Sequence, residues 1–287
     1  MTIWPASENQ SDARSDEVTM LETYKGKTVV IKYGGAAMQS EELKAGVIED
    51  IAWLAGTGAD VVLVHGGGPE LSALQKRLGL KPHFVDGLRY TDEDTMEAAL
   101  MALCGKVNKE LVRLLQNQGI KSVGISGIDG GLLLCEKQSS PDIGFVGNVQ
   151  KVGTDILKTL MKDCYIPVVS TVGLGEDGQL YNVNADTAAA EIAVGLAADD
   201  YITISDIPGL LRAADDPESL IGEIKANDVE GLIEEGVITG GMIPKARGLA
   251  GAVRNGAARA SIIDGRVINA LRLWMNGEIA GTRFIDG

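Results

Sequence analysis

The chain has 287 residues, which is enough for one large domain or for one domain with two lobes. Its formal net charge is −14 and its pI is near 4.6, and this acidity argues against a nucleic-acid-binding surface, which is normally basic. The acidity does not exclude an anionic small ligand, because a few local lysines can override the field of the whole molecule.

Cysteine and histidine usage disfavours a zinc site. The three cysteines, Cys104, Cys135 and Cys164, lie far apart without a CxxC pair, and the chain has only two histidines. No apolar run approaches the length of a membrane span, and the start lacks the apolar stretch of a signal peptide. We therefore expect a cytoplasmic protein with reduced thiols. Residues 1–19 are polar and acidic and predict a mobile tail or a weak helix.

Strands and helices are expected to alternate along the chain. The predicted strands are residues 28–32, 61–64, 121–126, 166–172, 201–205 and 259–264. The predicted helices are residues 41–55, 70–78, 91–118, 154–162, 186–196, 228–235 and 244–256, with hairpins between 127 and 151. Most of these strands are continuous apolar runs, which predicts an α/β fold with a largely parallel sheet covered on both faces. Ligands of such sheets bind at the carboxyl ends of the strands.

Two glycine-rich stretches, KYGG at 32–35 and HGGG at 65–68, follow apolar strands. Backbone N–H groups at such a turn can point at an anion, and glycine lets the backbone approach a phosphate closely. Either stretch alone could be an ordinary tight turn, but the two together favour a phosphate-type site.

Other phosphate signatures are absent or misleading. The Walker pattern GxxxxGK[ST] does not occur. The stretch GLGEDG at 173–178 matches GxGxxG, but turn residues and a strand-like run follow it instead of a helix. We interpret it as a hairpin, which disfavours a nicotinamide-dependent oxidoreductase.

Two lysines and one acid are candidate catalytic residues. Lys32 ends a buried strand beside glycines, where a fixed cation could stabilise charge on a transferring phosphoryl group. Lys245 follows Gly240-Gly241 at the mouth of a helix. Asp186 alone could be a helix N-cap, but beside two lysines it could be their common partner. An ordinary strand-end lysine stays the alternative for Lys32.

Taken together, these stretches resemble the amino-acid kinase superfamily and, within it, the N-acetyl-L-glutamate kinases. The resemblance spans about residues 25–284. It rests on GKTVVIKYGGAAM, VLVHGGGPEL, DGLRYTD, GNV, IPVVSTVG, YNVNADTAAAEIA, SDIPGLL and GGMIPKA, in that order. It implies a three-layer αβα sandwich around a mainly parallel sheet. A polar extension (1–24) would precede a single domain (25–287), whose acceptor-substrate lobe would be about 25–195 and whose ATP lobe about 196–287.

The resemblance also implies phosphoryl transfer from MgATP to the side-chain carboxylate of N-acetylglutamate, in arginine synthesis. The Mg²⁺ would be bound through the nucleotide, without a metal site of the protein's own. Lys32 and Lys245 would stabilise the transition-state charge, and Asp186 would hold both. The other implied residues are Gly34, Gly35 and Gly66 for the phosphate, Gly67 and Gly68 for phosphate and acceptor carboxylate, Arg89 for the α-carboxylate, Asn182 for the acetylamino group, and Asp206, Ile207, Pro208, Gly209, Leu210, Leu211, Val237, Ile238 and Thr239 for ATP.

The termini and one loop depart from the family's pattern. Residues 12–27 are short of the apolar residues of the hexamers' N-terminal helix, and Arg272 stands in a region where we expect an acid. We therefore expect a homodimer rather than a hexamer, without strong arginine inhibition. Ile128 also replaces an expected lysine. A related kinase of an amino-adipate derivative and a non-catalytic amino-acid sensor on the same fold stay open as alternatives.

Overall fold

A computed structural model describes residues 23–213 and 216–287 of the chain. The predicted tail at residues 1–19 and most of the atypical N-terminal stretch at 12–27 lie outside the described residues.

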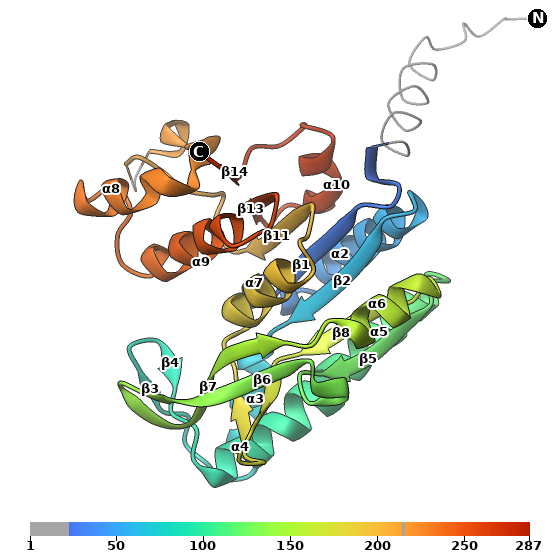
Figure 1. Cartoon of the computed structure of the whole chain (residues 1–287), viewed down its shortest axis with the longest axis vertical. Coiled ribbons are helices and arrows are strands. Elements are labelled where there is room, and N and C mark those ends of the chain that lie inside the picture. Colours follow the sequence, from blue (N-terminus) through green and yellow to red (C-terminus); the bar gives the residue numbers. More distant parts are fainter. Residues whose placement is uncertain (1–22, 214–215) are drawn as a thin grey trace, which may run out of the picture.

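A mainly parallel sheet crosses the molecule (Figure 1). Within the described residues it has eight strands, and only β13 and β14 pair antiparallel. Their spatial order is β12 (Glu223–Lys225), β14 (Thr282–Ile285), β13 (Arg259–Asp264), β11 (Asp200–Ser205), β1 (Thr28–Tyr33), β2 (Asp60–His65), β8 (Ile166–Ser170) and β5 (Ser122–Ser126). The expected parallel sheet is therefore confirmed, and β1 lies near its centre between β11 and β2.

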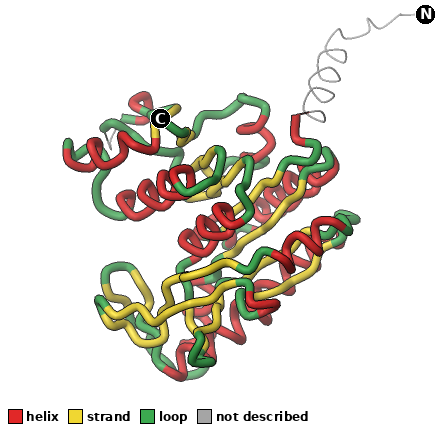
Figure 2. Tube along the Cα trace, in the orientation of Figure 1, coloured by secondary structure: helices red, strands yellow, loops and turns green. Residues whose placement is uncertain are grey.

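Helices cover both faces of this sheet, which gives the expected three layers (Figure 2). One face carries α2 (Glu41–Gly56), α5 (Asn108–Asn117) and α10 (Ala270–Met275). The other carries α6 (Asp155–Lys162), α7 (Ala185–Gly195) and α9 (Met242–Arg254), with α8 (Val229–Glu234) packed on α9. Helix α3 (Gly68–Arg77) and α4 (Glu93–Ala99) lie beyond the carboxyl ends of the strands. Short 3₁₀ turns are η1 (Gly35–Met38), η3 (Asp129–Gly131), η4 (Pro217–Ser219) and η5 (Ala226–Asp228).

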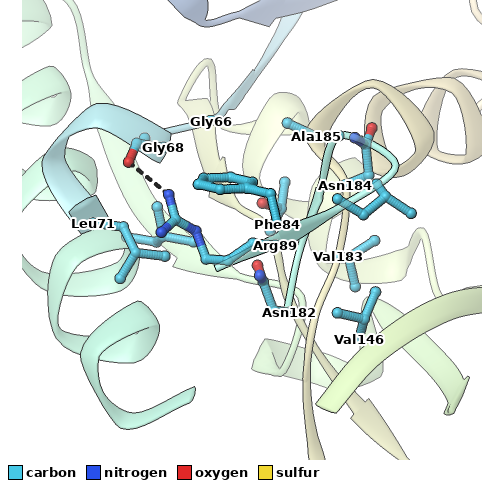
Figure 3. A pocket seen from close by; sticks show the side chains of 15 residues that line it. Gly66, Gly68, Leu71, Phe84, Arg89, Val146, Asn182, Val183, Asn184 and Ala185 are labelled. Carbon is cyan, nitrogen blue, oxygen red and sulfur yellow. Dashed lines mark hydrogen bonds between the residues drawn. The ribbon is translucent and has the colours of Figure 1, made fainter. Parts of the chain in front are cut away.

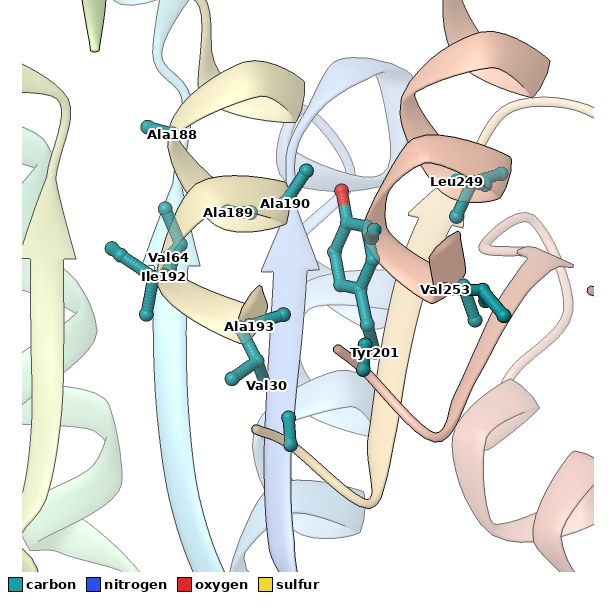
Figure 4. Close-up of a cluster of buried hydrophobic side chains, with 14 of the residues drawn as sticks. Val30, Val64, Ala188, Ala189, Ala190, Ile192, Ala193, Tyr201, Leu249 and Val253 are labelled. Carbon is teal, nitrogen blue, oxygen red and sulfur yellow. The ribbon is translucent and has the colours of Figure 1, made fainter. Parts of the chain in front are cut away.

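The core on the α7 face is built from small residues on the helices and branched or aromatic ones on the strands (Figure 4). Ala189 and Ala193 of α7 pack with Val30 of β1, and Tyr201 of β11 lies between α7 and α9. Alanine lets α7 approach the sheet closely, so the first turn of α7 comes within side-chain reach of β1.

Four further strands form a small sheet beside the main one. They are β6 (Leu133–Ser139), β7 (Asp142–Val152), β9 (Val172–Gly175) and β10 (Leu180–Asn182). The expected hairpin between 127 and 151 is β6–β7, which pair antiparallel. Strands β9 and β10 also pair antiparallel around GLGEDG, so the hairpin interpretation of that stretch is confirmed.

Three expectations need correction. The predicted helix 91–118 starts at Glu93, and its middle, η2 (Leu100–Val107), has π-helical hydrogen bonding. The predicted strand 166–172 breaks at Thr171, where the chain leaves the main sheet for β9. The sequence prediction missed β12, β14, α10 and the hairpin of β3 (Phe84–Val85) and β4 (Leu88–Arg89). These elements have two to six residues each, too few for a periodic pattern.

A buried carboxylate fastens the C-terminal segment to α2. Asp50 is completely buried and accepts hydrogen bonds from Asn269 Nδ2 at 2.9 Å, Leu271 N at 3.0 Å and Arg272 N at 3.3 Å. Burial raises the pKa of Asp50, and the hydrogen bonds to the charged form only partly oppose this shift. The carboxylate thus satisfies backbone donors at the start of α10 that would otherwise be buried without partners.

We predict that Asp50→Ala destabilises the fold. The substitution leaves several buried donors unpaired, so the free energy of unfolding should fall by about 2–4 kcal/mol in urea denaturation. Asp163→Ala is the control, because Asp163 is exposed at the end of α6, and it should change stability by less than about 0.5 kcal/mol. Equal stability of the two variants would contradict the anchoring role of Asp50.

Candidate active site

The two glycine-rich turns lie side by side. Strands β1 and β2 are parallel neighbours in register, with Tyr33 opposite His65, so both turns leave the same edge of the sheet. Gly66 N donates a hydrogen bond to Tyr33 O at 3.0 Å, which ties one turn to the other. Gly35 has a φ of 75°, a left-handed conformation that glycine adopts without strain. The structure therefore places the two stretches next to each other, as a shared phosphate-type site requires.

Lys32 is held on the α7 face of β1. Its side chain shares that face with Val30, and the residue is only 7% exposed. A methyl group at Gly34 would lie 3.4 Å from the Lys32 ammonium, so glycine keeps the space beside that charge open. The buried strand fixes the lysine, which disfavours the alternative of a solvated strand-end residue.

Asp186 lies in the first turn of α7 and is not its N-cap, so the N-cap alternative is wrong. The N-cap is Asn184, whose Oδ1 accepts hydrogen bonds from Asp186 N at 2.9 Å and Thr187 N at 3.1 Å. Because Asn184 satisfies the helix end, the Asp186 carboxylate is free to serve other groups. The Tyr201 hydroxyl also donates to Asp186 O at 3.2 Å and supports this turn from β11.

Both candidate lysines contact this one carboxylate. Lys32 Nζ lies 2.9 Å from Asp186 Oδ1 in an ion pair without hydrogen-bond alignment, and Lys245 Nζ donates to Asp186 Oδ2 at 3.3 Å. Burial by itself would raise the pKa of Asp186, but the two ammonium groups outweigh burial and lower it. The structure therefore brings together three residues that are far apart in the sequence.

Arg89 lines a cavity whose wall reaches Ala185, the residue directly before Asp186 (Figure 3). It is 9% exposed, and its guanidinium is fixed by neutral groups of α3. Nη2 donates to Gly68 O at 2.9 Å and to Ser72 Oγ at 2.8 Å, while Nη1 donates to Gln75 Oε1. The guanidinium also stacks 4.7 Å from the centre of the Phe84 ring.

The charge of Arg89 has no anionic partner in the described part of the chain. Among residues 23–213 and 216–287, no carboxylate lies within ion-pair distance of its guanidinium. Burial lowers the pKa of Arg89, although a guanidinium stays protonated. A buried cation without a counter-ion costs free energy, and an anionic ligand in the cavity would remove that cost.

The cavity has a volume of about 210 Å³, the scale of a small metabolite. Its wall combines the glycine turn, Arg89, Asn182 and the start of α7. Asn182 Nδ2 donates to Thr91 Oγ1 at 3.2 Å, which holds its amide at the wall. A methyl group at Gly67 would lie 2.6 Å from Leu103 Cδ2 and 3.2 Å from Val107 Cγ2, so glycine lets the turn pass close to η2.

The predicted nucleotide segments are separate from this cavity. The segment 206–211 continues from the carboxyl end of β11, and 237–239 precedes α9. Leu210 and Ile238 are 3% and 2% exposed, since their side chains belong to the core. Thr282 Oγ1 accepts from Leu210 N at 2.8 Å and donates to Ile221 O at 2.7 Å, which fixes the first segment.

Sequence reasoning missed several residues that complete the site. Gln75 and Ser72 hold Arg89, Phe84 stacks on it, and Asn184 caps α7. Only Asn184 had a signal in the sequence, because an asparagine directly before a predicted helix is a common N-cap. Contacts between the β3–β4 hairpin and α3 depend on tertiary structure and leave no local pattern.

Comparison with known proteins agrees with this geometry. The model of the amino acid kinase family matches residues 27–264. An acetylglutamate kinase of Clostridioides difficile (strain 630) is 47% identical over 88% of each chain, and one of Brachyspira hyodysenteriae is 47% identical over 92% of each.

Two solved structures share the fold. An N-acetylglutamate synthase from Neisseria gonorrhoeae, complexed with coenzyme A and N-acetyl-glutamate, has a TM-score of 0.83 at 21% identity. The aligned region covers 98% of this chain and 64% of the synthase chain. A carbamate kinase from Giardia lamblia bound to AMP-PNP has a TM-score of 0.71 at 18% identity, covering 91% and 99%. These two likenesses show the shared fold, and the family model together with the sequence relatives shows that the chain belongs to the amino acid kinase family and, within it, to the acetylglutamate kinases.

Proposed function

We propose that this chain transfers the γ-phosphoryl group of MgATP to the side-chain carboxylate of N-acetyl-L-glutamate, in the arginine pathway. A carboxylate oxygen attacks the γ-phosphorus while the bond to the β–γ bridging oxygen breaks, so ADP leaves and an acyl phosphate forms. The observation that carries the proposal is the pair of lysines fixed by Asp186 beside a cavity with an unpaired arginine. The 47% identity to acetylglutamate kinases over most of the chain supports the choice of acceptor.

Lys32 and Lys245 act on the charge of the transferring phosphoryl group. Phosphoryl transfer is catalysed mainly by positioning and by electrostatic stabilisation, and the acceptor carboxylate is already ionised, so no general base is needed. Asp186 holds the two ammonium groups in place and offsets their mutual repulsion. Backbone N–H groups of Gly34, Gly35, Gly67 and Gly68 surround the phosphoryl group and the acceptor carboxylate. Gly66, which was also expected to bind the phosphate, has its N–H occupied by Tyr33 O and contributes only the space that a glycine leaves.

The acceptor is recognised by charge and by amide chemistry. Arg89 takes the α-carboxylate as the counter-ion that the folded chain does not supply. Asn182, which also lines the cavity, binds the acetylamino group. These residues belong to the proposed acceptor lobe, about 25–195, and the nucleotide lies on the proposed ATP lobe, about 196–287.

The nucleotide lies over Asp206–Leu211 and near Val237–Thr239. Because Leu210 and Ile238 are buried in the core, these two contribute backbone contacts only. Mg²⁺ would enter with the nucleotide, bound to its phosphate oxygens, and would supply positive charge beside them.

We also propose a cytoplasmic homodimer without strong arginine inhibition. This proposal rests on the atypical terminal sequences. The Arg272 guanidinium lies 5.3 Å from the centre of the Trp53 ring and 3.7 Å from Asp50, so the cation that stands in place of the expected acid is paired within the fold. No helix in residues 23–213 and 216–287 is long and apolar enough to cross a membrane.

The proposed activity predicts selective ADP release. With MgATP, N-acetylglutamate should be turned over in preference to glutamate, α-aminoadipate and N-acetyl-α-aminoadipate, and added arginine should change the rate little. Preference for one of the two longer acids would instead indicate the alternative, a related kinase of an amino-adipate derivative. Turnover of none of the four acids would contradict a kinase of this substrate class and favour a sensor.

Lys32→Ala should lower kcat by about 10²-fold or more, with a smaller effect on the KM of either substrate, because the lost charge acts mainly in the transition state. Steady-state kinetics measure both quantities. Lys27→Ala is a matched control, since Lys27 also pairs with an aspartate, Asp199 at 2.7 Å, but at the amino end of β1. Near-normal turnover of Lys32→Ala would remove Lys32 from the mechanism.

Arg89→Lys should raise the KM for N-acetylglutamate by about 10-fold or more, because an ammonium has three donors and cannot keep the contacts with Gly68, Ser72 and Gln75 and also bind the carboxylate. The same assay with 4-acetamidobutyrate, which lacks the α-carboxylate, isolates the contact. The variant should lose most of the wild-type preference for N-acetylglutamate over this analogue. An unchanged preference would show that Arg89 binds another group.

A further inference from the structure

His65 is a buried residue that the proposed mechanism leaves without a role. It ends β2, directly before the glycine turn, and is 0% exposed. Alternation along β2 places its ring with Val61 and Leu63, on the α5 face of the sheet. Lys32, Asp186 and Lys245 lie on the opposite, α7 face. His65 therefore cannot contact the phosphoryl group directly.

The contacts of the ring define its protonation. Nδ1 lies 2.7 Å from Gly66 O, which can only accept, so Nδ1 carries a proton. Nε2 lies 3.1 Å from Asn108 Nδ2, and this amide is oriented by its donation to Val168 O at 2.8 Å. Asn108 Nδ2 is a donor and cannot accept, so a proton on Nε2 would have no acceptor there, and the ring is neutral with its proton on Nδ1. Complete burial lowers the pKa of His65 to about 4, although the hydrogen bond with Gly66 O by itself would raise the pKa.

The hydrogen bond to Gly66 O also orients the next N–H group. Gly66 O and Gly67 N belong to one planar trans peptide, in which the C=O and N–H groups point in opposite directions. With the carbonyl directed at the ring on the α5 face, the Gly67 N–H is directed toward the α7 face. In the described part of the chain, no backbone acceptor pairs with the N–H groups of Gly67 or Gly68. Both residues line the cavity that also contains Arg89.

We propose that His65 is a positioning residue for phosphoryl transfer, because its Nδ1–H fixes the Gly66–Gly67 peptide and thereby aims the Gly67 N–H at the developing negative charge. The proposal rests on the function proposed above. A preorganised donor needs no reorientation during the reaction, which is the basis of oxyanion-hole catalysis. Without the ring, a peptide flanked by two glycines has many accessible orientations.

Neutrality is part of this role. A neutral ring donates to Gly66 O through Nδ1 and presents the unprotonated Nε2 to the Asn108 amide, so the ring is accommodated without a buried charge. The two amide hydrogens of Asn108 are shared among Nε2 and two backbone carbonyls. Asn108 in turn reaches Ile125 O at 3.2 Å and Val168 O, on two neighbouring strands. The orientation of the glycine turn is thereby tied to the frame of the sheet.

The first test is ¹⁵N NMR of the histidine side chains in the unmodified full-length protein. The chain has only His65 and His83, so the spectrum has two ring systems. His65 should be neutral at about pH 7 with its proton on Nδ1. A proton on Nε2, or a charged ring, would overturn the proposal without reference to activity.

The second test compares His65→Asn with His65→Gln. The asparagine amide can occupy the place of Nδ1 and donate to Gly66 O, whereas the longer glutamine amide extends toward Asn108 and leaves Gly66 O unpaired. His65→Gln should lower kcat for N-acetylglutamate by about 10-fold or more, with less change in KM, and His65→Asn should recover most of that loss. Both variants lose the ring, so their difference isolates the hydrogen bond from packing.

The outcomes separate this proposal from the proposed function. Equal kcat values for the two variants, with wild-type turnover intact, would overturn the positioning role alone. A wild-type protein that does not phosphorylate N-acetylglutamate would overturn the proposed function and this role with it.

Discussion

The carboxylate of Asp186 binds two cations that the chain brings from its two ends. Lys32 comes from the first strand and Lys245 from the helix α9, and without a shared counter-ion they would repel each other in a poorly solvated space. The position of Asp186 depends in turn on α7, whose alanines let it lie close on β1 and β11. Asn184 caps the helix and leaves the carboxylate available, so the packing of one helix determines the geometry of the charged centre.

The two halves of the site balance charge in opposite ways. At Asp186 the balance is internal, since the chain itself supplies the partners of the carboxylate. At Arg89 it is left incomplete, because Gly68 O, Ser72 and Gln75 orient the guanidinium but carry no charge. The first arrangement fixes the two lysines that we propose act on the phosphoryl group. The second leaves Arg89 with affinity for an anion, on which the proposed binding of the substrate carboxylate depends. A carboxylate in place of Gln75 would orient Arg89 equally well and would remove that affinity.

The sequence was sufficient for the parts of the site that depend on local patterns. An apolar strand followed by glycines identified Lys32 and both turns, and alternation of strands with helices gave the layered fold. Lys245 and Asp186 were recognised by type, with Asp186 as a possible common partner of the two lysines, and the structure shows that both lysines contact its carboxylate. The partners of Arg89 were not predictable, because they join α3 to a hairpin of two-residue strands. The tautomer of His65 depends on Asn108, which lies 43 residues away.

In the proposed reaction, backbone N–H groups of the glycine turn contact the reacting carboxylate, and side chains select the rest of the acceptor. The acceptor meets side chains, Arg89 and Asn182, whose hydrogen-bonding geometry selects one carboxylate and one amide. The nucleotide segments turn two of their side chains, Leu210 and Ile238, into the core and offer backbone there, and the buried Thr282 keeps the first segment in place. Substitutions at Arg89 or Asn182 can therefore change acceptor specificity one contact at a time. Substitutions at Leu210 or Ile238 act through the packing of the core and would change stability together with nucleotide binding.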